Sequence, residues 1–173
     1  MARIPYHDLN DLPEKLAETI KKAPPLNIYR MLAHAPTVAP GFLKMGGAIL
    51  TASELDPKLR ELVILRVGIL SDASYEIYQH RRVAASVGLD EKKVAAVLNE
   101  TDEPVLDDLE QLLVRFTDSV VKDVKAPDEL FNEVSEKLSP RLLSELLLTI
   151  GFYMMVSRFL ENTGVDIEEK PAL

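Results

Sequence analysis

Two long segments, each begun by a proline, are apolar on nearly every face of a helix. The first spans residues 57–70 and is interrupted by Glu61 and Arg66, and the second spans residues 140–163. A helix that is apolar all round belongs in a protein core or in an oligomer interface. The sequence therefore predicts a fold built around two buried helices. So much apolar surface in a small chain also predicts a homo-oligomer.

Helix start and stop signals recur along the rest of the chain. Asp56, Ser139 and Ala126 precede prolines, which are tolerated at the first position of a helix, and Gly88 and Gly164 stand at expected helix ends. We find no alternating pattern typical of a strand. The predicted fold class is all-α, with helices near residues 12–22, 27–34, 38–52, 57–70, 73–87, 91–98, 104–124, 127–137 and 140–163.

The length of 173 residues fits one domain. We predict an N-terminal segment with a short helix (1–26), a helical domain (27–166) and a C-terminal tail (167–173). Residues 55–59 and 138–142 share a leucine, a proline and a second leucine in register, which suggests a duplicated helical unit. Two unrelated helices that both begin with proline explain this similarity equally well.

The negative charge is concentrated in one stretch. Residues 90–137 hold 14 acidic and 6 basic side chains, and this excess equals the net charge of −8 of the whole chain. A nucleic-acid-binding protein needs a basic patch, so we predict no nucleic-acid partner. The simplest interpretation of the acidic stretch is a solvated outer layer of helices, and an acidic docking face is the alternative.

Neither a secretory signal nor a membrane span is predicted. The N-terminal residues contain no apolar core of a signal peptide. The most apolar run, Leu146 to Ser157, would form a helix of about 18 Å, whereas a bilayer core is about 30 Å thick. We therefore expect a cytoplasmic protein with no membrane partner.

The chain has no cysteine and only three histidines, which narrows its chemistry. Disulfides, thiolate nucleophiles and cysteine-bound metals are excluded. Glu76 and His80 supply only two neighbouring metal ligands, and His7 and His34 are far away in sequence. The sequence also lacks a glycine-rich phosphate loop. We predict neither a metal site nor a cofactor.

The candidate catalytic residues are Glu61, Glu76 and His80. Glu76 and His80 are four residues apart and share one face of a helix, where a carboxylate orients an imidazole and favours its protonated form. If helices 57–70 and 73–87 pack antiparallel, Glu61 comes level with His80. Glu61 interrupts an apolar run, so it needs a partner such as Arg66, His80 or another chain. An ordinary surface pair is the alternative for Glu76 and His80.

Four further residues are candidates for substrate binding. Arg66 and Arg81 can each hold a substrate carboxylate through a bidentate contact. Tyr75 and Tyr78 flank Glu76, although aromatic residues at such positions are more often core or interface residues.

The chain resembles the carboxymuconolactone decarboxylase family, which shares its fold with the alkylhydroperoxidase AhpD. The resemblance covers roughly residues 27–166 and implies an all-α fold that commonly forms trimers or hexamers. It is carried by residues 28–34, 60–67, 75–80, 84–89, 150–160 and 164–165.

The resemblance also assigns positions in the candidate site. The peroxidase branch of the family carries a glutamate, a Cys-x-x-Cys motif and a histidine four residues after the second cysteine. These positions correspond here to Glu61, to Ala73 and Glu76, and to His80. Both thiols are absent, so the disulfide relay cannot operate in this chain.

The resemblance to the cysteine-free branch implies a cofactor-free lyase that acts on a small carboxylated lactone or a related acid. His80 would then protonate the carbanion left by loss of carbon dioxide, and Glu61 or Glu76 would orient the imidazole of His80. Two alternatives stay open. One is an AhpD-like antioxidant protein by family alone, and the other is a non-catalytic oligomer that binds a small ligand.

Overall fold

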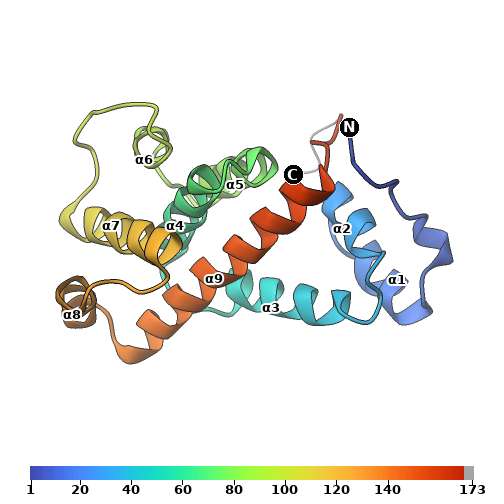
Figure 1. The fold of residues 1–173 in the computed structure, drawn as a ribbon, viewed down its shortest axis with the longest axis horizontal. Coiled ribbons are helices and arrows are strands. Elements are labelled where there is room, and N and C mark those ends of the chain that lie inside the picture. The colour runs from blue at the N-terminus through green and yellow to red at the C-terminus, as the bar shows by residue number, and fades with distance from the viewer. Residues whose placement is uncertain (170–173) are drawn as a thin grey trace. The chain divides into compact units, whose positions relative to one another are not determined.

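The structure of the protein is a computed structural model that describes residues 1–169. This part of the chain is all-α, as predicted, and contains no strand (Figure 1). The predicted tail 167–173 lies outside the described residues from position 170 onward. After a short 3-10 turn (Leu9–Asp11) come α1 (Glu14–Lys21), α2 (Asn27–Leu32), α3 (Ala39–Thr51), α4 (Pro57–Leu70), α5 (Ser74–Ser86), α6 (Glu91–Val97), α7 (Asp108–Asp123), α8 (Asp128–Lys137) and α9 (Pro140–Thr163).

The predicted start and stop signals operate at both long apolar helices. The Asp56 side chain accepts hydrogen bonds from the first backbone N–H groups of α4, and α9 begins at Pro140. Gly88 follows α5 with a φ of +74°, and Gly164 follows α9 with a φ of +66°. Glycine adopts this left-handed conformation at little cost, which is why it ends helices.

The predicted start of helix 104–124 was wrong. The helix begins at Asp108, because Asp107 and Glu110 form a reciprocal capping box there. The Asp107 side chain accepts from the backbone N–H of Glu110, and the Glu110 side chain accepts from the backbone N–H of Asp107, each at 2.9 Å. This pattern was visible in the sequence as an acidic residue followed three positions later by glutamate.

The described residues form two compact units. One comprises Met1–Ala52 and the residues from Phe159 onward, and the other comprises Ser53–Arg158. Every candidate site residue belongs to the second unit. The boundaries that we predicted near residues 26 and 166 remain predictions.

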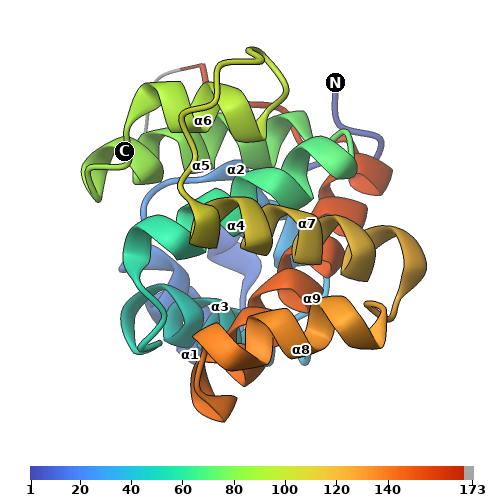
Figure 2. The ribbon, with the colours of Figure 1, turned by 90° about the vertical axis from the view of Figure 1, so that its left-hand side faces the viewer.

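Helix α4 is the central helix of the second unit. It contacts α5, α6 and α7, and α8 packs on α7 (Figure 2). Every residue from Arg60 to Gly68 is buried, which confirms the prediction of a core helix. Because α4 is enclosed in this way, its charged residues must find partners inside the protein.

Helix α9 is buried on one face only, so the prediction that it is enclosed all round was wrong. Leu146, Ile150 and Tyr153 are buried, whereas Leu148 and Met155 are exposed. By length and composition α9 could also cross a membrane, with a mean hydropathy of 1.4 over its most apolar window. The core helix of a soluble protein passes the same test.

Candidate functional site

The site is built on the hairpin formed by α4 and α5, which lie side by side (Figure 1). Residues 71–73 connect the two helices, and Asp72 adopts a φ of +50° in this turn. Near the turn Gly68 faces Ile77, and a Cβ atom at Gly68 would lie only 3.1 Å from Cγ1 of Ile77. The absence of a side chain at Gly68 therefore allows the two helices to approach closely, and further along the hairpin Glu61 reaches His80.

Glu61, Glu76 and His80 form one buried cluster. The Nδ1 atom of His80 lies 2.6 Å from Oε2 of Glu61, and its Nε2 atom lies 3.3 Å from Oε2 of Glu76. Glu61 is completely enclosed, and the other two side chains are less than a tenth exposed. The hairpin thus brings the three predicted catalytic residues together, with one carboxylate at each nitrogen of the imidazole.

Burial and charge act in opposite directions on His80. Burial alone lowers the pKa of an imidazole, but the hydrogen bond to Glu61 and the charges of Glu76 and Glu61 outweigh it. The pKa of His80 is therefore raised above its ordinary value, although the nearby charge of Arg60 opposes the increase.

Burial also raises the pKa of Glu76, and the negative charge of Glu61 adds to this increase, while His80 opposes it. Glu76 therefore holds a proton more readily than an exposed glutamate does. Because its carboxyl group faces Nε2 of His80, one proton can reside on either partner. An arrangement of this kind can donate or accept a proton at one point in space.

Arg60 and Tyr153 complete the surroundings of the cluster. Nε of Arg60 donates to Oε1 of Glu61 at 3.1 Å, so the two oxygens of one carboxylate hold a guanidinium and an imidazole. The ring of Tyr153, on α9, packs edge-on against His80 with 4.8 Å between ring centroids. Neither residue was predicted to belong to the site, although Arg60 was visible in the sequence as a second charged residue beside Glu61 in an apolar helix.

Arg66, a candidate for substrate binding, lies in a different ion-pair network. Its Nε and Nη2 donate to the two carboxylate oxygens of Asp118 at 2.5 and 2.7 Å. Its Nη1 donates to the carbonyl of Val97 and to the side chain of Asn99. These contacts tie α4 to α7 and to the end of α6, which is a structural arrangement.

The remaining candidates lie around α5. Arg81 pairs with Glu91 and Glu100, and it remains a third exposed. Tyr75 is buried, and the hydroxyl of Tyr78 accepts a hydrogen bond from Arg82 at 3.3 Å. The roles of these side chains in substrate binding remain predictions.

The two positions that correspond to the cysteines of the peroxidase branch lie at the start of α5. Ala73 is the buried N-cap residue, and Glu76 lies in the first turn of the helix. Glu76 therefore occupies the place of the second thiol and directs a carboxylate at His80. Within the described part of the chain, no group of three or more histidine, aspartate, glutamate or cysteine side chains could hold a metal ion.

The sequence of this chain was compared with models of known protein families. Residues 36–118 match the model of the Carboxymuconolactone decarboxylase family. Over this segment, the chain is similar to that family. The segment contains Arg60, Glu61, Glu76 and His80, so the entire charged cluster lies within the family match. No curated protein sequence matches the chain.

Three solved structures are similar to this one. An uncharacterized peroxidase-related protein from Ralstonia eutropha JMP134, with an alkylhydroperoxidase AhpD core, is 17% identical with a TM-score of 0.84, over 97% of this chain and 93% of the other. The debrominase Bmp8, in complex with 2,3,4-tribromopyrrole, is 16% identical with a TM-score of 0.80, over 98% and 95%.

The third structure is a putative antioxidant defence protein AhpD from Agrobacterium tumefaciens. It is 18% identical with a TM-score of 0.74, over 80% of this chain and 96% of the other. Identities this low establish the common fold, and the chemistry has to be argued from the residues of this chain.

Proposed function

We propose that this protein is a cofactor-free lyase that decarboxylates a small carboxylated lactone or a related acid. The observation that carries the proposal is the buried line Glu61–His80–Glu76, in which each nitrogen of one imidazole faces a carboxylate. The residues required for proton transfer are present, and the chain has no cysteine for a thiol relay.

The proposed reaction has two steps, bond breaking in the substrate and proton transfer from the enzyme. The bond between carbon and the carboxylate breaks, carbon dioxide leaves, and the electron pair moves into a neighbouring carbonyl as an enolate. His80 then delivers a proton from Nε2 to the carbon, and a proton from water restores the pair formed by His80 and Glu76. Glu61 holds Nδ1, fixes the orientation of the ring and stabilises its positive charge.

Turnover of carboxylated γ-lactones tests this proposal. Carbon dioxide release and product formation are measured by NMR for the wild type and for His80→Gln, with His34→Gln as the matched control outside this site. A general acid contributes about 10²- to 10⁴-fold, so His80→Gln should lose that factor while His34→Gln keeps wild-type activity. Absence of release across the panel, or equal rates in the wild type and His80→Gln, would overturn the lyase.

The same preparation separates the two rival functions. Some similar structures are of peroxidase-related proteins and one is of a debrominase, so peroxide consumption with a dithiol donor is measured in parallel. Peroxide consumption at an enzymatic rate would contradict the exclusion of thiol chemistry. Binding of a lactone without turnover would favour a non-catalytic ligand-binding protein.

We also propose that the protein is a homo-oligomer. Helix α9 exposes apolar side chains on one face, among them Leu148 and Met155, and such surface is typical of an interface. The family resemblance suggests a trimer or a hexamer. Light scattering coupled to size-exclusion chromatography measures the mass of the assembly, and a monomer at micromolar concentration would refute this proposal.

A further inference from the structure

Arg60 is a buried guanidinium with unused donors. The residue is only 5% exposed, and the single hydrogen bond of its guanidinium runs from Nε to Glu61. Among residues 1–169, Nη1 and Nη2 of Arg60 have no hydrogen-bond acceptor. The enclosed side-chain polar atoms that lack a partner do not include these two nitrogens, so both have some exposed surface.

An arrangement of this kind is costly for the fold and needs a reason. A buried charge is normally surrounded by hydrogen-bond partners, because desolvation of unpaired N–H groups is unfavourable. Arg66 follows that rule, with four hydrogen bonds from its guanidinium. Arg60 departs from it and leaves open the edge of the guanidinium that carries two parallel N–H groups.

That edge has the shape of a carboxylate-binding fork. Two parallel N–H donors match the two oxygens of a carboxylate, and this bidentate contact is a strong and geometrically specific one. We propose that the Nη1–Nη2 edge of Arg60 binds a carboxylate of the small-molecule substrate and thereby positions that molecule beside His80. The role of this contact in turnover rests on the proposed lyase function, whereas the binding of the carboxylate does not.

The position of Arg60 relative to His80 is fixed by Glu61. Nε of the guanidinium is bound to Oε1 and Nδ1 of the imidazole to Oε2 of the same carboxylate, so Glu61 holds both side chains in one cluster.

The carboxylate held by Arg60 is the one that the product retains. A departing carboxylate loses its charge on the way to carbon dioxide, so an ion pair with it would stabilise the substrate more than the transition state. An ion pair with a retained carboxylate is the same in both states. We therefore expect a lactone with a single carboxylate, which imitates the product, to bind without reacting.

Binding of paraconate, a γ-butyrolactone with one carboxylate, tests this inference by titration calorimetry on the full chain. We expect the wild type to bind paraconate more tightly than its uncharged methyl ester. Arg60→Gln should weaken binding of paraconate by about 10- to 100-fold and leave binding of the ester unchanged. The affinity of Arg60→Lys for paraconate should lie between those of the wild type and Arg60→Gln, because lysine keeps the positive charge but lacks two parallel N–H donors.

Two further variants make the result specific. Arg115→Gln, at an exposed arginine on α7, is the matched control and should bind paraconate like the wild type. Arg81→Gln tests the competing residue, and loss of paraconate binding in Arg81→Gln instead of Arg60→Gln would overturn the proposal. Absence of binding to the wild type, or equal affinity for acid and ester, would also overturn it.

If Arg60→Gln does not fold, the side-chain nitrogen resonances of Arg60 in the wild type provide the same information. Paraconate should shift them and slow the rotation of the guanidinium, and unchanged resonances at saturating paraconate would refute the contact. If paraconate binding depends on Arg60 but no substrate is decarboxylated, the proposed lyase function is refuted and the carboxylate site at Arg60 is supported. If substrates are decarboxylated and Arg60→Gln does not change the rate, the lyase function is supported and the carboxylate site at Arg60 is refuted.

Discussion

Helix α4 carries two buried arginines that the structure uses in different ways. Arg60 and Arg66 are six residues apart, or about 9 Å along the helix axis. The guanidinium of Arg66 is saturated by Asp118, Asn99 and the Val97 carbonyl, whereas that of Arg60 has a single partner, Glu61. The saturated network joins helices together, and the unsaturated one leaves donors available to a ligand.

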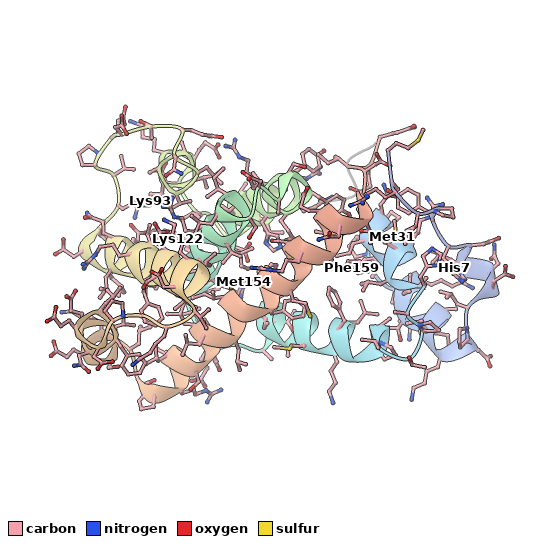
Figure 3. All side chains as sticks on the ribbon, viewed as in Figure 1. His7, Met31, Lys93, Lys122, Met154 and Phe159 are labelled. Carbon is pink, nitrogen blue, oxygen red and sulfur yellow. The ribbon has the colours of Figure 1, made fainter. Side chains whose placement is uncertain are left out.

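The two networks differ in their surroundings as well. Asp118 keeps about a quarter of its side-chain surface exposed, and it pairs with Lys122 at 3.3 Å. Lys122, on α7, is labelled in Figure 3. Glu61 is fully enclosed and binds both Arg60 and His80. Neutralising the carboxylate should therefore have more severe consequences in the Arg60 network than in the Arg66 network.

Neutralising the central carboxylate of each network should give the largest effect. Glu61→Gln leaves Arg60 and His80 without their shared partner, and breaking such a buried pair costs about 3–5 kcal/mol of stability. Asp118→Asn should cost less, because water reaches that side chain. Urea denaturation of both variants measures the difference, and a smaller loss in Glu61→Gln than in Asp118→Asn would contradict the comparison.

Replacing each arginine by methionine should reverse the order of the two networks. Arg66→Met removes four hydrogen bonds and should cost about 3 kcal/mol. Arg60→Met removes a guanidinium with unused donors and leaves Glu61 paired with His80. We therefore expect the free energy of unfolding to change by less than about 1 kcal/mol. Equal losses of unfolding free energy in the two variants would show that Arg60 is a structural residue.

The two networks should also respond to opposite ends of the pH scale. Burial raises the pKa of Asp118, but the hydrogen bonds and charge of Arg66 and the charge of Lys122 outweigh it and lower the pKa below 3.8. The stability that Asp118 contributes is present above its unfolded pKa and is lost as the pH falls through the lower folded value.

His80 behaves in the opposite sense, because its folded pKa is raised above 6.5. Its contribution is complete below 6.5 and is lost as the pH rises through the folded value, and the raised pKa of Glu76 acts in the same direction from 4.5 upward. Urea denaturation between pH 2 and 9 should show a smaller acid loss in Asp118→Asn and a smaller loss above 6.5 in His80→Gln than in the wild type. An unchanged profile in either variant would contradict its assignment.

The smallest effects concern the spacing of α4 and α5. Gly68→Ala places a Cβ atom against Ile77, which should separate the helices near the turn, while alanine favours the helix by about 1 kcal/mol. Turnover, if present, should fall by about tenfold with little change in stability. Gly88→Ala should do the reverse and cost about 1 kcal/mol without affecting turnover, because Gly88 adopts a positive φ. Thermal denaturation and rate measurements on both variants check this contrast.

Local signals made much of this structure predictable. Prolines and caps located α4 and α9 to the residue, and a helical spacing of four combined with a short turn brought Glu61, Glu76 and His80 together. The missed start of α7 was also a local signal, since the capping box is written in the sequence.

Pairings between distant residues were not predictable in the same way. Arg66 and Asp118 are 52 positions apart, and no local pattern distinguishes a saturated arginine from one with free donors. The edge-on packing of Tyr153 on His80, and the burial of only one face of α9, likewise depend on which helices meet. Only tertiary packing decides such contacts.

The charged cluster comes entirely from two consecutive helices joined by three residues. Arg60 and His80 are separated by only 20 positions, so closing the loop between them costs little chain entropy. Contacts of such short range form readily early in folding. The α4–α5 hairpin can therefore assemble the cluster before the more distant pair of Arg66 and Asp118 has met.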